Sequence, residues 1–146
     1  LRRIGAVAGV ALAGCLGSPD AAAVGGGDEV PLEEWLSNVT NFDGVVDRTD
    51  EDRITVEVGS RANGGPYGYT PAAVKISPGT TVAFQWISHK HNVVVERQPN
   101  EGGWEGHTPI ENRGFEFEST FDVPGEYHYF CQPHLSLGMK GAVVVE

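Results

Sequence analysis

A cysteine, a histidine and a methionine lie within one short segment near the end of the sequence. The segment from Cys131 to Met139 reads CQPHLSLGM, with the histidine at His134. Its thiolate, imidazole and thioether are soft donors, and copper is the metal that such donors suit. The segment therefore predicts a copper site, and a mononuclear site of this type needs one further histidine from elsewhere in the chain.

Two histidines, His89 and His91, are candidates for this missing ligand. His91 is the better candidate because the residues after it, up to Val95, predict a strand that can bring an imidazole beside the loop. If both histidines lie on one strand, they point to the same face, so spacing alone does not choose between them. His107 and His128 have no partner ligands at a useful spacing, and we interpret each as a surface or strand histidine.

The cysteine content supports a metal-bound thiol. The sequence has two cysteines, Cys15 and Cys131, and Cys15 lies in what resembles an export segment. A structural disulfide in the mature domain is therefore not expected. An unpaired thiol outside the cytoplasm is readily oxidised unless it is buried or bound to a metal. Metal binding explains Cys131, and a buried inert cysteine is the alternative.

The first residues predict export and a lipid anchor. Residues 1–14 have the order of a signal peptide, with Arg2 and Arg3 before a run of small and apolar residues. The four residues ending at Cys15 resemble a lipobox, which predicts a lipidated cysteine. Residues 15–28 therefore form the lipidated cysteine and a glycine-rich flexible tether. We expect the protein to be held by lipid at the outer face of the cell membrane.

Composition restricts the fold and the partners. The 146 residues, of which 40% are hydrophobic, suit a single folded domain, which we place at residues 29–146. A formal net charge of −10 disfavours nucleic acid as a partner. The acidic surface is either a general aid to solubility or an adaptation to high salt, and composition does not separate the two.

Short alternating segments predict an all-β domain. Pro31 to Asn38 favours a short helix that packs Trp35 on the domain. Pro78-Gly79 and Pro124-Gly125 are turn signals. Seven or eight short strands indicate a β-sandwich. The predicted strands cover residues 54–58, 74–76, 81–86, 91–95, 115–121, 127–130 and 142–145.

The mature chain resembles the cupredoxins, specifically plastocyanin-like proteins and their haloarchaeal lipoprotein relatives, the halocyanins. His91-Asn92-Val93 matches the segment that supplies the first histidine in that family. The spacing of Cys131, His134 and Met139 matches the plastocyanin-type loop rather than the longer azurin-like or shorter amicyanin-like loops. The resemblance implies a Greek-key sandwich and one type 1 copper per chain, held by His91 and these three residues. The extra histidine, His89, departs from the family pattern.

Roles can also be expected for residues around the ligands, for Asn92 from the resemblance and for the others from their own chemistry. Asn92 matches the asparagine that ties the two ligand segments together, and a plain turn-forming asparagine is the alternative. Pro133 cannot donate a backbone hydrogen bond, so it reduces polar contact near the sulfur and stiffens the loop. We expect Pro133, Leu135 and Leu137 to surround the exposed edge of His134 and to form a docking patch. The alternative is that the leucines are core residues.

These expectations predict an electron carrier rather than an enzyme. The carrier would be a monomer that shuttles single electrons between membrane-bound redox proteins by Cu(I)/Cu(II) cycling. A copper nitrite reductase or oxidase would need further copper ligands or a second domain. A copper storage or delivery protein without a shuttle role is the main alternative. A zinc site is disfavoured because methionine is an unusual ligand for zinc.

Overall fold

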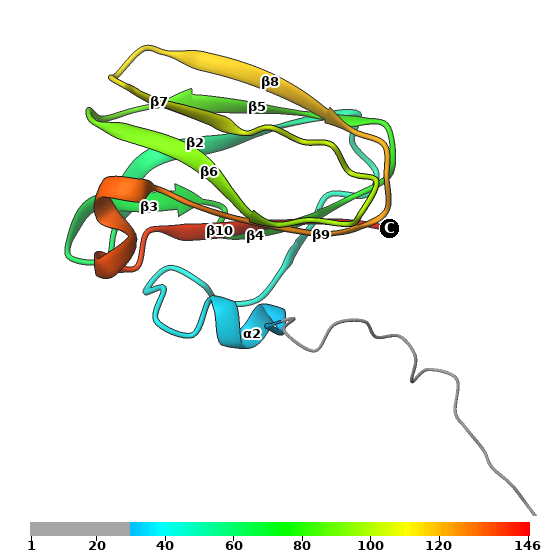
Figure 1. Ribbon diagram of the computed structural model, residues 1–146, viewed down its shortest axis with the longest axis horizontal. Coiled ribbons are helices and arrows are strands. Elements are labelled where there is room, and N and C mark those ends of the chain that lie inside the picture. The colour runs from blue at the N-terminus through cyan, green and yellow to red at the C-terminus, as the bar shows by residue number, and fades with distance from the viewer. Residues whose placement is uncertain (1–29) are drawn as a thin grey trace, which may run out of the picture. The chain divides into compact units, whose positions relative to one another are not determined.

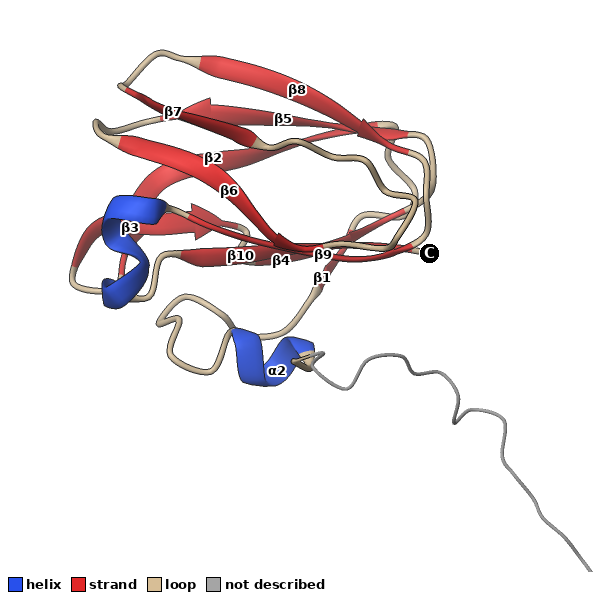
Figure 2. Ribbon diagram, viewed as in Figure 1, coloured by secondary structure: helices blue, strands red, loops and turns tan. Residues whose placement is uncertain are grey.

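Two β-sheets, packed face to face, make up most of the part of the chain that the structure describes (Figure 1). The structure is a computed structural model that describes residues 30–146. The predicted signal peptide, Cys15 and the tether up to residue 28 lie outside the described residues. Within residues 30–146, the helices and strands are the short helix α2, the 3-10 helix η1 and ten β-strands (Figure 2). The predicted sandwich is therefore confirmed.

The larger sheet has six strands and the smaller has four. The order in the larger sheet is β1 (Val46–Asp47), β4 (Ala73–Ile76), β10 (Lys140–Val145), β9 (Gly125–Phe130), β6 (His91–Arg97) and β7 (His107–Glu111). The order in the smaller sheet is β3 (Gly65–Thr70), β2 (Arg53–Ala62), β5 (Thr80–Trp86) and β8 (Glu116–Phe121). Neighbouring strands are often distant in sequence, as a Greek-key arrangement requires. The pairs β1 with β4, β4 with β10 and β2 with β5 are parallel.

Every predicted strand is present, and β1, β3 and β7 are additional. β1 has only two residues, too few to show an alternating pattern. β3 contains Pro66 and two glycines, and β7 contains Pro109. Proline and glycine are depleted in strands and count against a strand in a sequence pattern. Pairing with β2 and β6 overrides this local preference.

The alternating residues of the strands form the core between the sheets. Val82, Phe84 and Trp86 of β5 are buried, as the pattern predicts. Phe84 packs edge-on against Tyr129 from the opposite sheet, with ring centroids 5.7 Å apart. Such aromatic pairs add to the free energy gained by burying their area. Packing of this core holds the ends of the strands in fixed positions.

A shorter helix than predicted covers the outer face of the larger sheet. α2 spans Leu32–Trp35, and the chain turns after Leu36, which is buried. So short a helix is not stable by itself, so packing must hold it. The indole of Trp35 donates a hydrogen bond to the carbonyl of Gly141 (3.1 Å) and stacks on the ring of His128. The expected packing of Trp35 on the domain is confirmed.

Among residues 30–146, no helix has the length and apolar character needed to cross a membrane.

Candidate metal centre

Three of the four predicted ligands meet at one end of the sandwich. His91 is the first residue of β6, Cys131 follows β9, and His134 lies in η1 (Gln132–Leu137). Their ligand atoms lie within 4.8 Å of one another. The Nδ1 atoms of the two histidines are 3.2 Å apart. The sulfur of Cys131 lies 3.7 Å from Nδ1 of His91 and 3.4 Å from Nδ1 of His134.

These three atoms fit a metal ion of copper size. A triangle with these sides has a centre about 2.0 Å from each corner, which matches a usual metal–imidazole distance and is slightly short for metal–sulfur. One thiolate and two imidazoles are the equatorial donors of a blue-copper site. The donor set and its spacing therefore suit copper.

The backbone of Met139 lies beside Cys131 because the ligand loop closes on itself. The amide of Cys131 donates to the carbonyl of Met139 (3.0 Å), and the amide of Met139 donates to the carbonyl of His134 (3.2 Å). Gly138 ends η1 with φ 102°, in the left-handed region that glycine adopts readily. A Cβ at Gly138 would lie 2.9 Å from the carbonyl oxygen of Asn38. Met139 is fully buried.

Burial keeps the histidines neutral and the thiol protonated until a metal binds. Burial, then the charge of nearby His134, lowers the pKa of His91 to about 4. Burial also lowers the pKa of His134 and raises that of the Cys131 thiol. A neutral imidazole can bind a metal directly, whereas the thiol must lose its proton, which a bound metal favours. Copper uptake should therefore release one proton from Cys131.

Two aromatic side chains hold the backbone at the start of β6. The indole of Trp86 donates to the carbonyl of His91 (2.8 Å). The hydroxyl of Tyr69 donates to the carbonyl of Asn92 (2.6 Å). The pairing of β6 with β7 is irregular between His91 and Val93. These two core side chains thus provide hydrogen bonds to the two carbonyls at this irregularity. They thereby fix the direction of the His91 side chain.

Asn92 connects the His91 strand to the ligand loop. Its side-chain oxygen accepts a hydrogen bond from the amide of Gln132 (2.8 Å), the residue after Cys131. Its side-chain amide donates to the carbonyl of Thr108 in β7 (2.8 Å). Asn92 is completely buried, so the alternative of a plain turn residue is wrong.

The structure separates His91 from its competitor His89. β6 begins at His91, and Lys90 has φ 73°, so the two histidines do not share a strand face. The expectation that they could is wrong, because the left-handed residue turns the chain between them. His89 is exposed, and its Nδ1 accepts a hydrogen bond from the amide of Arg113 (3.3 Å).

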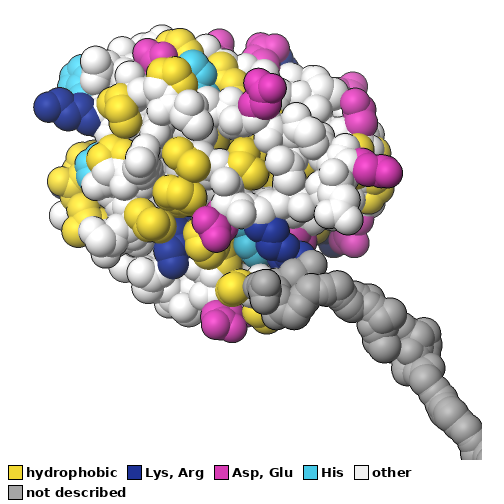
Figure 3. Space-filling view, viewed as in Figure 1, with side chains coloured by type: hydrophobic (Ala, Val, Ile, Leu, Met, Phe, Trp, Pro, Cys, Tyr) yellow, Lys and Arg dark blue, Asp and Glu magenta, His cyan; other side chains and the backbone are white. Residues whose placement is uncertain are grey.

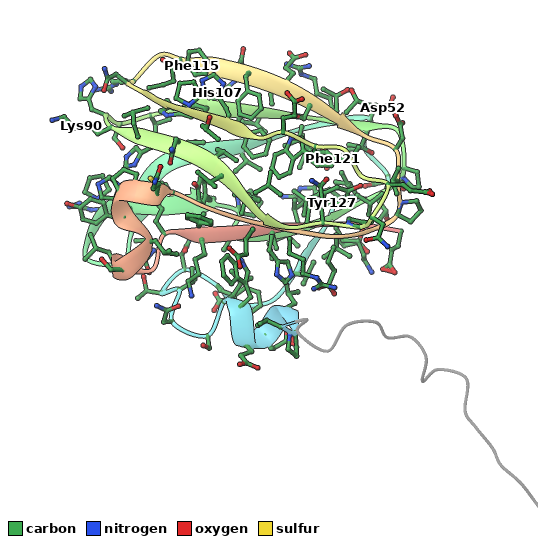
Figure 4. The ribbon with its side chains drawn as sticks, in the orientation of Figure 1. Asp52, Lys90, His107, Phe115, Phe121 and Tyr127 are labelled. Atoms are coloured by element: carbon green, nitrogen blue, oxygen red, sulfur yellow. The ribbon has the colours of Figure 1, made fainter. Side chains whose placement is uncertain are left out.

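Neither of the other two histidines joins the cluster. His107 lies against Phe115, with ring centroids 4.6 Å apart (Figure 4), and its Nε2 is 2.8 Å from a carboxylate oxygen of Glu111. His128 lies on β9 beneath Trp35. Both are strand histidines with contacts of their own.

The outer side of the ligand loop is apolar and open. Leu135 is 37% exposed and Leu137 is 47% exposed, so they are not core residues. Pro133 is exposed, and His134 is half-buried between this surface and the site. On the face shown in Figure 3, acidic side chains lie away from the end that carries η1.

Sequence reasoning missed two residues that touch the histidine ligands. The ring of Tyr67 lies 4.7 Å from that of His134, and Ser88 contacts His91. Tyr67 belongs to β3, which the sequence pattern did not show. Ser88 lies three residues before His91, a position that only the turn through Lys90 brings close.

Residues 54–146 match a known family, described as copper binding proteins, plastocyanin/azurin family. The chain belongs to this family. The match includes all four predicted ligands, which are arranged as a type 1 copper site. Copper is accordingly the cofactor of this member of the plastocyanin/azurin family.

Similar proteins and structures agree with this assignment. A halocyanin from Natronomonas pharaonis is 39% identical over 109 residues, which are 72% of this chain and 64% of the halocyanin. The crystal structure of pseudoazurin from Methylobacterium extorquens AM1 has a TM-score of 0.56 and 31% identity over 64% of this chain and 75% of that one. A copper-containing nitrite reductase from Thermus scotoductus has a TM-score of 0.52 and 28% identity over 64% of this chain but only 22% of that one.

Proposed function

We propose that the protein carries single electrons between redox partners, with copper held by His91, Cys131, His134 and Met139. The observation that carries the proposal is the packing of the three equatorial donor atoms 3.2 to 3.7 Å apart on a stiff sandwich. Copper supplies a one-electron couple between Cu(I) and Cu(II). A site whose ligands do not move when the charge changes transfers an electron with little rearrangement.

The protein contributes rigidity and exclusion of water rather than catalysis. His91, Cys131 and Met139 are fully buried, so His134 is the ligand that reaches toward the surface. This leaves the edge of one imidazole as the route for electrons. The similarity to nitrite reductase covers 22% of that enzyme, so it relates this domain to one part of the enzyme.

Repeated redox cycling tests this proposal against copper storage or delivery. The full chain, loaded with one equivalent of copper, would be reduced with ascorbate and reoxidised with ferricyanide several times beside a Cu(I) chelator. A carrier keeps its copper through every cycle and returns to the same spectrum. Loss of the metal to the chelator in the first reduced state would instead favour delivery.

We also propose that Pro133, Leu135 and Leu137 form the docking patch for redox partners. Residues 127–145 contain no acidic residue, although the chain as a whole carries a net charge of −10. Short-range apolar contact therefore suits this end better than charge steering, particularly in high salt, where the screening length is only about 3 Å at 1 M.

Electron self-exchange between two copies of the protein tests the patch without an identified partner. Leu137→Asp should slow self-exchange, measured by NMR line broadening in mixtures of oxidised and reduced protein, because a carboxylate disfavours close apolar contact. Val45→Asp is the matched control, since Val45 is also exposed (38%) and lies before β1. Equal rates in the two variants would contradict the docking patch.

Export and anchoring complete the proposal. We propose that residues 1–14 are removed, that Cys15 is lipidated, and that residues 15–28 tether a monomeric carrier to the outer face of a membrane near membrane-bound partners. The similarity to halocyanin supports this placement. Cys15→Ser should move the protein from the membrane fraction to the soluble fraction. An unchanged distribution would contradict the lipid anchor.

A further inference from the structure

Two hydrogen bonds connect Nε2 of His91 to the backbone of the smaller sheet. Nε2 of His91 lies 2.8 Å from the hydroxyl oxygen of Ser88. The same hydroxyl donates a hydrogen bond to the carbonyl of Gly59 in β2 (2.8 Å). His91 is fully buried, so this contact replaces the solvent that an exposed ring nitrogen would have.

The number of available protons determines the direction of both hydrogen bonds of Ser88. A carbonyl oxygen can only accept, so the single hydroxyl proton of Ser88 is used toward Gly59. The hydroxyl oxygen must then accept from Nε2–H of His91. A neutral imidazole has one N–H, so Nδ1 keeps its lone pair. That lone pair faces the sulfur of Cys131 (3.7 Å) and Nδ1 of His134 (3.2 Å), where the copper would bind.

The backbone of β2 is shaped for this contact. The pairing of β2 with β3 shifts register between Val58 and Ser60, so Gly59 lies in a bulge. Its φ is +93°, and a Cβ there would lie 2.0 Å from the Ser88 hydroxyl oxygen and 2.7 Å from Nε2 of His91. Only glycine leaves this space open. The amide of Ile87 also donates to the carbonyl of Val58 (2.8 Å), which holds Ser88 against the bulge.

We propose that Ser88 is a positioning residue for the copper site. Its hydroxyl holds His91 in the Nε2–H tautomer, with Nδ1 ready to bind, and couples the ligand to the Gly59 bulge of the other sheet. Hydrogen bonds of this kind to a ligating histidine fix its tautomer and orientation and raise its basicity. The inference rests on the proposed role of His91 as a ligand, but its tautomer can be measured without copper.

The first test is a two-bond ¹H–¹⁵N NMR spectrum of the copper-free full chain at neutral pH. Wild-type His91 should be in the Nε2–H form, and Ser88→Ala should shift it toward a mixture of tautomers. Ser88→Thr, which keeps the hydroxyl, should restore the wild-type form. Ser77→Ala is the matched control, because the Ser77 hydroxyl also donates to a backbone carbonyl at 2.8 Å but lies beyond β4, away from the site.

The second test is the affinity for Cu(II), measured by competition with a chelator. Ser88→Ala should weaken binding about 10- to 100-fold, the usual effect of removing an outer partner of a ligating histidine. Ser88→Thr and Ser77→Ala should bind as the wild type does. An Nδ1–H tautomer in the wild type would overturn the proposal even if Ser88→Ala does not fold. So would a folded Ser88→Ala with wild-type tautomer and affinity.

Discussion

At the scale of single residues, Met139 differs from the other ligands because its thioether is a weak donor. It is fully buried, and leucine has a similar volume. Met139→Leu should therefore cost less than about 1.5 kcal/mol of stability and keep the protein blue. The reduction potential should rise, because Cu(II) is stabilised less when the axial thioether is absent. Voltammetry of the copper-loaded variant checks this, and an unchanged potential would show that Met139 does not contact the metal.

His128 gives the domain a pH dependence that copper binding does not require. Burial lowers the pKa of His128 from its ordinary value of 6.5, although the bond to Glu126 acts in the opposite direction. The unfolded chain therefore binds this proton more readily, so stability from neutral His128 is present above pH 6.5 and is lost below it. The ring of Trp35, which stacks on His128, provides no hydrogen-bond acceptor for a protonated imidazole.

Replacing His128 should remove this part of the pH dependence. The free energy of unfolding of the copper-free protein, from urea titrations at pH 7.5 and pH 5.0, should fall less in His128→Gln than in the wild type. Both proteins share every other titrating group, so the difference between the two changes isolates His128. Parallel changes in the two proteins would mean that His128 is not responsible.

At the scale of elements, the ligand loop and β6 depend on each other through one asparagine. Asn92→Ala removes the buried side chain that pairs with the amide of Gln132 and the carbonyl of Thr108. The copper-free protein should lose about 2 kcal/mol of stability, since each of the two hydrogen bonds contributes about 0.5–1.5 kcal/mol. Urea unfolding measures this loss. A change below about 1 kcal/mol would show that water or a shifted loop replaces both bonds.

The elements also show what sequence could and could not predict. The spacing of Cys131, His134 and Met139 is local and predicted the loop, and the alternation in β5 predicted its buried face. The contacts of Ser88 and Tyr67 could not be predicted in this way. The first depends on a left-handed residue at Lys90 and a bulge at Gly59, and the second on a strand rich in glycine. These features arise from pairing between distant segments.

At the scale of the whole molecule, the charge of −10 should make stability depend on salt. Repulsion among the carboxylates opposes the compact state, and salt screens it. Raising KCl from 0.05 to 1 M should increase the melting temperature by about 4 °C if screening recovers about 1 kcal/mol. A double variant, Asp50→Asn with Asp52→Asn, should show a smaller increase. A melting temperature that falls with salt would contradict this account.

The most direct test of the central claim is the visible spectrum of the full chain with Cu(II), before and after ascorbate. A cysteine thiolate on Cu(II) in a two-histidine site gives the intense blue colour of this type of centre. The wild type should be blue, lose its colour on reduction and regain it on oxidation, while Cys131→Ser should bind copper without the colour. A colourless wild-type protein that binds one copper would contradict the role of Cys131 and the electron-carrier function.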